Sequence, residues 1–288
     1  MAAFDDNSGR GLTMASSNGS GRSDPSGKVI EVDSVSRSFE RADGQRVNAV
    51  DTMSADVLDG EFVCVVGPSG CGKTTLLQMI AGLLMPTEGE IRVAGSRVTG
   101  PGPDRGVVFQ KDSVFPWMRV LHNVEYGLKC RGVPTDRRRE IAHRFLAMVG
   151  LSAVEKAWPR ELSGGMLKRV AVATVFANGA HVLLLDEPFA ALDYVTKHQL
   201  HDVLLELWMA ADVGSRRTVV FVTHDVEEAL SLSDRILVMN AGRLVDDIAV
   251  QAPRPRTTDT LLEPEMVEIK HVLLGHLGLE QSRTGARG

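Results

Sequence analysis

The residues best suited to chemistry form a glycine-rich segment that follows a short apolar run. Residues 67–74 match the phosphate-loop pattern G-x-x-x-x-G-K-[ST]. The glycines allow a sharp turn that presents backbone N–H groups to phosphates, and the following helix adds the positive end of its dipole. The segment therefore predicts binding of a nucleoside triphosphate. An ordinary glycine turn in an α/β protein is the alternative.

Two side chains of this segment carry specific chemistry. We expect the ammonium of Lys73 to reach the β- and γ-phosphates. The hydroxyl of Thr74 is expected to bind Mg²⁺, which bridges two phosphate oxygens and offsets their charge. The residues expected to contact the nucleotide here are Gly67, Pro68, Ser69, Gly70, Cys71, Gly72, Lys73, Thr74 and Thr75.

Two carboxylates follow a second apolar run. Asp186 and Glu187 come directly after residues 182–185, which are typical of a buried parallel strand. Ligands bind at the carboxyl ends of such strands. We expect Asp186 to hold Mg²⁺ and Glu187 to accept a proton from, or orient, the water that attacks the γ-phosphate. A solvated strand end that is merely acidic is the alternative.

A serine and two glycines open a third candidate segment. Ser163, Gly164 and Gly165 precede a helical pattern that continues to Ala177. A serine N-cap with exposed backbone amides forms a cradle for an anion. Because Ser-Gly-Gly is also a common loop, this segment gains weight only in combination with the other motifs.

The composition is that of an ordinary soluble globular protein. The chain has 288 residues, 43% of them hydrophobic, which is enough for a sizeable core. The formal net charge of −5 argues against nucleic acid as a partner. The three cysteines cannot all pair and lack metal-ligand spacing, which favours a reducing cytosolic compartment. The sequence shows neither the roughly 18-residue apolar run of a membrane span nor a secretory signal.

The elements that must position these motifs can be predicted from periodicity. Alternating apolar residues at 29–35 and 47–58 predict an antiparallel pair. A βαβ unit is expected to begin with strand 61–66 and helix 73–81, followed by strands at 90–93 and 105–110. The remaining predicted elements are an all-helical insert over 120–178, strands 182–185 and 218–222 around a helix 194–211, a hairpin of 235–239 and 243–249, and a helix 264–277.

Composition shifts divide the chain into three parts. Residues 1–27 are rich in Gly, Ser, Asp and Asn and are expected to form a disordered tail. Residues 28–250 are expected to form one ATPase domain, with a helical subdomain at about 111–179. Residues 251–288 are expected to form a C-terminal extension with one helix.

Taken in chain order, the motifs resemble those of the ATP-binding-cassette (ABC) ATPases, and the resemblance covers about residues 29–249. The resemblance implies an α/β fold, with a P-loop NTPase (RecA-like) core, an antiparallel β subdomain and an inserted α-helical signature subdomain. It also implies that the chain binds ATP together with Mg²⁺ and hydrolyses the ATP. The matching segments are the phosphate loop, Leu162-Ser163-Gly164-Gly165, Leu185-Asp186-Glu187-Pro188, Ala191-Leu192-Asp193 and Thr223-His224-Asp225.

The resemblance assigns roles to residues that the local chemistry leaves open. Gln110 would sense Mg²⁺ and the attacking water, and His224 would act as a switch near the γ-phosphate. Phe39 would stack on adenine. In isolation, each of the three has an ordinary alternative: a polar strand end, a surface histidine and a core aromatic, respectively.

Other matched positions belong to a dimer. The resemblance implies that Ser163, Gly164 and Gly165 contact the γ-phosphate bound to the opposite subunit, and that Asp193 lies at the dimer seam. Two positions depart from the usual pattern. Met166 replaces the usual glutamine, and Thr174 stands where arginine is frequent.

A finer likeness links the chain to importer ATPases for nitrate, sulfonates and taurine. It rests on residues 100–110, 115–117 and 253–256. In that branch the segment after Gln110 faces a membrane permease, so Trp117 and Met118 are candidate contacts, since large apolar side chains often anchor such grooves. Packing of Trp117 inside the helical insert is the alternative.

The predicted function is that of a homodimeric ATPase subunit of an importer for a small solute. Its expected partners are integral membrane permease subunits and, indirectly, an extracytoplasmic solute-binding protein, with no nucleic acid. It would lie at the cytoplasmic face of the membrane, bound through the permease. The first alternative is a soluble ABC-type ATPase acting on nucleic acid or ribosomes. The second is a nucleotide-binding regulatory subunit without useful hydrolysis, which the presence of Glu187 disfavours.

Overall fold

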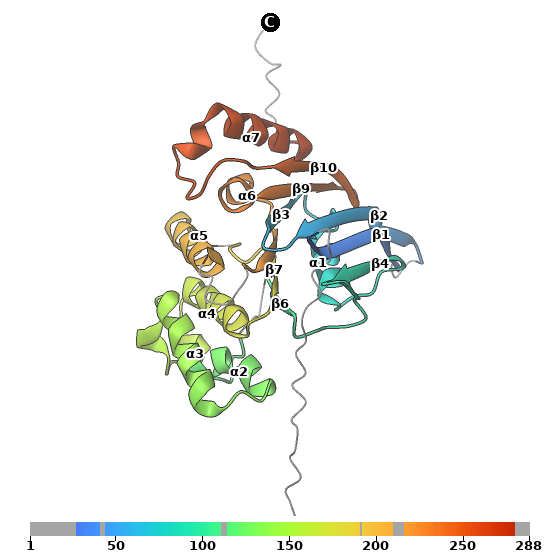
Figure 1. The fold of residues 1–288 in the computed structure, drawn as a ribbon. Helices are drawn as coiled ribbons and strands as arrows, with labels where there is room; N and C mark the ends of the chain where they lie inside the picture. Colours follow the sequence, from blue (N-terminus) through green and yellow to red (C-terminus); the bar gives the residue numbers. More distant parts are fainter. Residues whose placement is uncertain (1–26, 41–43, 111–113, 191, 210–215, 280–288) are drawn as a thin grey trace, which may run out of the picture.

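The structure is a computed structural model that describes residues 27–40, 44–110, 114–190, 192–209 and 216–279. The described residues form a four-stranded sheet, a six-stranded sheet and a set of helices (Figure 1). The predicted α/β architecture with an antiparallel subdomain and a helical insert is confirmed.

The four-stranded sheet is antiparallel and has the order β2-β1-β4-β5. The predicted pairing of the first two strands is confirmed, because the two strands run antiparallel along most of their length. The strands are β1 Lys28–Glu40, β2 Arg46–Leu58, β4 Glu88–Val93 and β5 Ser96–Arg97.

The expectation that β4 continues a βαβ unit is wrong. β4 pairs antiparallel with β1. Its buried side chains Ile91 and Val93 alternate with more exposed ones, and they join the hydrophobic core of the four-stranded sheet. A strand with one buried face suits an antiparallel sheet, whereas a central parallel strand is buried on both faces.

The six-stranded sheet has the order β10-β9-β3-β8-β7-β6. Neighbouring strands from β9 to β6 are parallel, and β10 returns antiparallel to β9 as the predicted hairpin. The carboxyl ends of the parallel strands therefore meet at one edge. The strands are β3 Phe62–Val66, β6 Arg105–Val108, β7 Val182–Asp186, β8 Thr218–Val222, β9 Arg235–Asn240 and β10 Arg243–Ala249.

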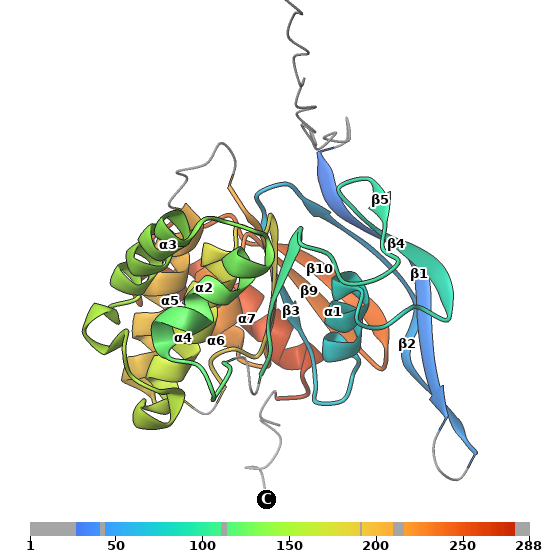
Figure 2. The same ribbon diagram turned by 90° about the horizontal axis from the view of Figure 1, so that it is seen from below.

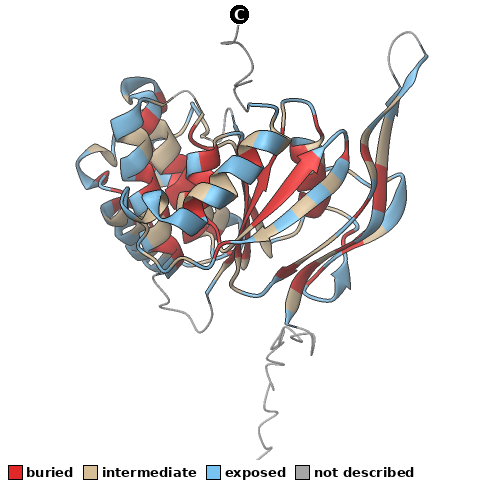
Figure 3. Cartoon of the chain, turned by 90° about the horizontal axis from the view of Figure 1, so that it is seen from above, coloured by how far each residue is buried: buried red, intermediate tan, exposed pale blue. Residues whose placement is uncertain are grey.

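Helices cover both faces of the six-stranded sheet. Along β3, Phe62, Cys64 and Val66 join the core shared with the larger group of helices. Val63 and Val65 join the core around α1 Lys73–Ala81, which lies between the two sheets (Figure 2). The buried positions accordingly concentrate in the central strands and the inner helix faces (Figure 3).

The helical insert lies between β6 and β7 in the chain and projects beyond the sheet edge (Figure 1). Its three α-helices pack on one another. No helix in the described ranges is long and apolar enough to cross a membrane. The insert contains α2 Val120–Cys130, α3 Thr135–Met148, η1 Ser152–Val154, η2 Pro159–Glu161 and α4 Gly164–Ala177.

The remaining helices follow the strands of the core. They are α5 Tyr194–Met209, α6 Val226–Leu232, η3 Thr260–Leu262 and α7 Pro264–His276. Arg256 fastens the start of the C-terminal segment by donating hydrogen bonds to the carbonyl oxygens of Leu230 at 2.7 Å and Val250 at 3.0 Å. Burial lowers the pKa of Arg256 to about 10, which leaves the guanidinium charged at neutral pH.

Candidate nucleotide site

The phosphate loop wraps around its own lysine. The Lys73 side chain is buried, and its Nζ donates to the carbonyl oxygens of Gly67 at 2.8 Å and Pro68 at 3.0 Å. A cavity of ≈ 220 Å³ opens on the loop. The predicted residues that line it are Ser69, Gly70, Gly72, Lys73, Thr74, Thr75 and Glu187.

Backbone contacts explain why the loop uses glycine. Gly72 has φ +106°, and a Cβ there would lie 2.1 Å from the carbonyl oxygen of Ala49. At Gly67, a Cβ would lie 2.1 Å from the carbonyl oxygen of Met239. Cys71 is buried beside the loop, with its Sγ 3.9 Å from Lys73 Nζ. At Gly67 and Gly72, the neighbouring backbone therefore leaves no room for a Cβ atom.

Asp186 at the end of β7 contacts Thr74 in the first turn of α1. Thr74 Oγ1 donates to Asp186 Oδ1 at 3.0 Å. Burial and then the neighbouring charge of Glu187 raise the pKa of Asp186. A buried carboxylate beside a hydroxyl is a suitable pair of hard oxygen donors for Mg²⁺.

The donor set also fits the way Mg²⁺ binds with nucleotides. Among the described residues, no group of three or more His, Cys, Asp or Glu side chains could hold a metal. Mg²⁺ commonly takes one or two protein ligands and completes its shell with phosphate oxygens and water. The Thr74 and Asp186 pair therefore fits an ion that arrives with the nucleotide.

Three strands bring three side chains together around one carboxylate oxygen. Gln110 Nε2 donates to Glu187 Oε2 at 3.1 Å, and His224 Nδ1 lies 3.2 Å from the same oxygen. These residues follow β6, β7 and β8, whose carboxyl ends are adjacent in the sheet. Sequence patterns placed each residue at a strand end, and the parallel sheet brings them together.

The backbone of Glu187 is held in an unusual conformation. Its φ is +41°, which is uncommon for a residue with a side chain. Its N–H donates to the carbonyl oxygen of Val222 at 3.0 Å, which ties the end of β7 to the end of β8. Such strain costs of order 1–3 kcal/mol and persists where surrounding structure fixes it, often at functional sites.

The glycine-rich segment at the start of α4 does not line the phosphate-loop cavity of its own chain. The residues that line that cavity include none of Ser163, Gly164 and Gly165. Ser163 acts as the N-cap of α4, since its Oγ accepts from Met166 N–H at 3.3 Å. Gly165 is buried, and a Cβ there would lie 2.6 Å from Thr196 Cγ2 on α5.

The predicted nucleotide contacts Phe39 and Asp193, like Gly67, Pro68 and Cys71 of the loop, are also absent from the cavity lining. Phe39 is 41% exposed, so it is not a core aromatic, and the Arg37 guanidinium lies 4.8 Å from its ring centre. Asp193 is exposed, and its Oδ1 accepts from the Thr196 N–H at 3.0 Å at the start of α5. A hydrogen bond with the Thr196 side chain, and then the one from its backbone N–H, lowers the pKa of Asp193.

Met166 and Thr174, which depart from the usual family pattern, are both accommodated by their immediate neighbours. Met166 is partly buried and packs against the core that the helices share with the six-stranded sheet. Thr174 Oγ1 donates to the carbonyl oxygen of Val170 at 2.8 Å, one turn earlier in α4. The hydroxyl is therefore satisfied within the helix.

Sequence reasoning missed two neighbours of the site. Ala49 of β2 lines the phosphate-loop cavity, and Lys168 of α4 donates to the backbone carbonyl of Gln110. Neither residue belongs to a motif. No local signal could have identified Ala49, because the antiparallel sheet brings this strand to the loop.

The comparisons with known proteins agree with this geometry. The family model described as ABC transporter matches residues 50–190. An uncharacterized ABC transporter ATP-binding protein of Methanocaldococcus jannaschii is 46% identical over 250 residues, which cover 86% of this chain and 91% of the relative. The chain therefore belongs to the ABC transporter ATP-binding proteins, which are P-loop ATPases.

Relatives with more specific names also align along most of their length. A nitrate import ATP-binding protein of Synechocystis is 43% identical over 258 residues, with 85% of this chain and 95% of the relative covered. A taurine import ATP-binding protein of Chromobacterium violaceum is 46% identical over 202 residues, with 70% and 76% covered.

A solved structure with a similar fold is a dimeric ATP-binding cassette in a post-hydrolysis state, bound to ADP and Pi. It has a TM-score of 0.68 and 29% sequence identity, and the match covers 78% of this chain and 100% of that chain.

Proposed function

We propose that the chain binds and hydrolyses ATP to power import of a small solute through a membrane permease. The observation that supports this most is the position of Glu187, which lines the phosphate-loop cavity while Gln110 and His224 approach one of its carboxylate oxygens. That arrangement supplies a base beside a triphosphate site.

In the proposed reaction, a water oxygen attacks the γ-phosphorus while Glu187 accepts a proton from that water. The bond from the γ-phosphorus to its bridging oxygen breaks, and the electron pair stays on ADP. Gln110 and His224 hold the Glu187 carboxylate and orient the water. Lys73 exchanges its carbonyl contacts for phosphate oxygens. Mg²⁺, held by Thr74 and Asp186, would offset charge on the phosphates.

A second copy would complete each site. Because Ser163, Gly164 and Gly165 lie outside the cavity of their own chain, they are free to serve the nucleotide of a partner. Two-fold pairing lets both copies exchange the same segments. Asp193 would then lie at the seam. ATP closes the pair only to the extent that it binds the closed form more tightly than the open form.

The helical insert carries the surface proposed to meet the permease. Trp117 is 67% exposed, which argues against packing inside the insert. Phe115 has ring-centre distances of 5.4 Å to Trp117 and 4.8 Å to Tyr126. This aromatic group, with Met118 beside it, suits the apolar side of a short permease helix. The subunit would thereby sit at the cytoplasmic face of the membrane.

The solute class is proposed from the relatives. Proteins named for nitrate and taurine import share more than 40% identity with this chain. We therefore propose a small anionic or sulfur- or nitrogen-containing solute, delivered to the permease by an extracytoplasmic binding protein. Action on nucleic acid or ribosomes has no comparable support, and the net charge is −5.

The proposal can be tested by reconstituting the chain with its permease in vesicles. ATP and Mg²⁺ enclosed in the vesicles together with this subunit should drive accumulation of a solute supplied outside with its binding protein, with release of phosphate inside, because an importer moves solute to the side on which its ATPase lies. Uptake that proceeds equally without this subunit would refute the transport role. Absence of phosphate release in any combination would refute the hydrolytic role.

A further inference from the structure

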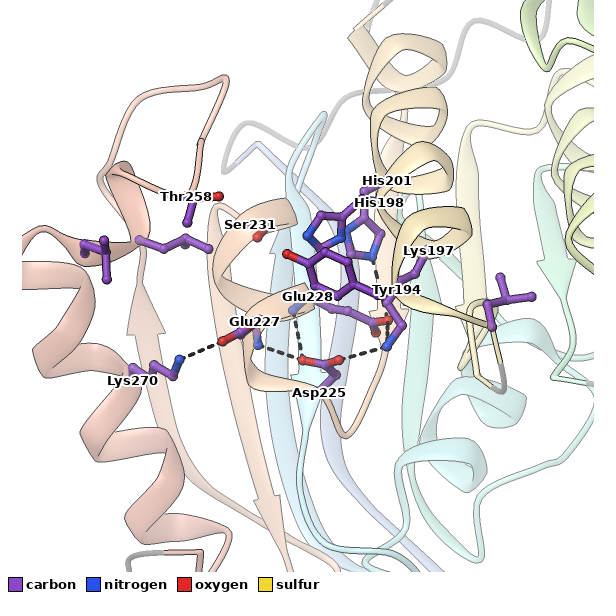
Figure 4. A pocket seen from close by; sticks show the side chains of 13 residues that line it. Tyr194, Lys197, His198, His201, Asp225, Glu227, Glu228, Ser231, Thr258 and Lys270 are labelled. Atoms are coloured by element: carbon purple, nitrogen blue, oxygen red, sulfur yellow. Dashed lines mark hydrogen bonds and ion pairs between the residues drawn. The ribbon is translucent and has the colours of Figure 1, made fainter.

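We propose that Lys197 is a positioning residue that ties the loop of Asp193 to the loop of His224 and so sets His224 beside Glu187. The inference rests on the proposed role of His224 in hydrolysis. It assigns a function to a side chain that no sequence motif marks. Figure 4 shows Lys197 between α5 and the start of α6.

Lys197 connects two elements that carry different parts of the site. Its backbone N–H donates to the carbonyl oxygen of Asp193 at 2.9 Å, so it lies in the first turn of α5. Its Nζ lies 2.9 Å from Asp225 Oδ2 and 3.2 Å from Glu228 Oε1, both in or next to α6. A single ammonium thus bridges the Asp193 and His224 loops.

The carboxylates of Asp225 and Glu228 in turn hold the turn that contains His224. Asp225 Oδ1 accepts from the N–H groups of Glu227 at 2.9 Å and Glu228 at 3.3 Å, which caps α6. The Asp225 N–H donates to Thr223 Oγ1 at 3.0 Å, and Thr223 Oγ1 donates to Glu228 Oε2. The turn is therefore held immediately before and after His224.

Lys197 and its two carboxylate partners line the same small cavity as Glu187 and His224. A cavity of ≈ 60 Å³ is lined by Glu187, Ala190, Lys197, Thr223, His224, Asp225 and Glu228. The other basic side chain beside Glu228 is His201, whose buried Nε2 lies 3.7 Å from Glu228 Oε1. In the described part of the chain, Lys197 is therefore the cation that contacts both carboxylates.

Loss of the Lys197 charge would leave two carboxylates facing each other in a partly buried place. Their repulsion would move the turn that holds His224. Lys197 does not line the phosphate-loop cavity, so ATP binding should change little. The expected result is a lower kcat for ATP hydrolysis at a nearly unchanged KM. The rates are expressed per ATP-binding site titrated in the same sample, because loss of folded protein alone would also lower the apparent kcat without changing KM.

The test compares three variants of the full-length chain by steady-state ATP hydrolysis. Lys197→Met should lower kcat at least tenfold and change KM less than twofold, while Lys197→Arg should keep kcat within threefold of wild type. Lys270→Met is the matched control: Lys270 lines the neighbouring pocket in Figure 4 and pairs with Glu227 at 2.8 Å, away from the His224 turn. It should behave as wild type.

The outcomes separate this inference from the proposed function. A Lys197→Met kcat within twofold of wild type, or no better activity in Lys197→Arg, would overturn the positioning role while wild-type hydrolysis still stands. Absence of hydrolysis in wild type would instead refute the proposed function. Should Lys197→Met fail to fold, Lys197→Gln, which keeps hydrogen-bond donors without the charge, is measured against the same limits.

Discussion

At the residue scale, the charged groups of the candidate site have partners within the protein. Lys73 contacts two carbonyl oxygens, and Asp186 accepts from Thr74. Glu187 has Gln110 and His224 at one oxygen. The side chains are therefore held near their expected working positions, and a triphosphate replaces contacts instead of ordering loose groups.

Lys73→Ala should weaken ATP binding by about 10- to 100-fold, because it removes a charge-assisted contact worth about 1.5–3 kcal/mol. Isothermal titration calorimetry with ATP and Mg²⁺ measures the change in Kd. Lys129→Ala removes an exposed lysine of α2 and serves as the control. Equal affinities for the two variants would count against the phosphate loop as the binding site.

At the element scale, the site depends on close approaches between the two sheets. The phosphate loop follows β3 of the six-stranded sheet, and its backbone meets Ala49 of the four-stranded sheet. The turn at His224 is similarly fixed from α5 and α6. Substitutions that disturb these approaches should affect both stability and nucleotide binding.

Gly72→Ala should lower the free energy of unfolding by about 3 kcal/mol. It combines the cost of a left-handed conformation with overpacking against the Ala49 carbonyl oxygen, which a Cβ would approach to 2.1 Å. Gly95→Ala is the control, since Gly95 has φ +73° but nothing lies within 4 Å of its Cβ position. That variant should lose only about 1 kcal/mol. Urea unfolding compares the two, and similar losses would show that the close approach is unimportant.

Glu228→Gln should be destabilising in a pH-dependent way. Burial opposes the charge of Glu228, but contacts with His201, the Thr223 hydroxyl and Lys197 outweigh it, so the pKa of Glu228 lies below its ordinary value of 4.5. A lowered folded-state pKa stabilises the fold above the unfolded pKa, and this contribution is lost as pH falls. We expect a loss of about 3 kcal/mol at pH 7 that shrinks below about pH 4.5.

Urea unfolding of wild type and Glu228→Gln at neutral and acidic pH measures that difference. Glu206→Gln changes an exposed carboxylate of α5 and should have little effect at either pH. A difference between wild type and Glu228→Gln that stays constant with pH would argue against a stabilising Glu228 charge.

At the scale of the whole molecule, sequence patterns located segments well and their spatial partners poorly. The strand before the phosphate loop and helix Lys73–Ala81 were predicted because local periodicity and glycine mark them. The placement of β4 was wrong, because strand pairing depends on distant residues. Ala49 and Lys197 reach the site only through tertiary packing and belong to no motif. The motifs indicated that Glu187, Gln110 and His224 belong to one site. They did not indicate that Gln110 and His224 approach the same carboxylate oxygen of Glu187.

Trp117→Ala should leave ATP binding by the isolated subunit unchanged and reduce its affinity for permease-containing vesicles roughly 30-fold, as expected for loss of an aromatic anchor. Co-sedimentation with such vesicles measures the effect. Leu262→Ala is the control, since Leu262 is 70% exposed but lies on the C-terminal segment. Unchanged binding by Trp117→Ala would move the permease contact elsewhere.

The central claim is that two copies close around ATP and that Glu187 then drives hydrolysis. Sedimentation velocity of Glu187→Gln with Mg²⁺ and saturating ATP tests it most directly, because binding persists while turnover stalls. We expect a stable dimer with ATP and a monomer without nucleotide. A Glu187→Gln chain that binds ATP and still sediments as a monomer at every protein concentration would contradict it.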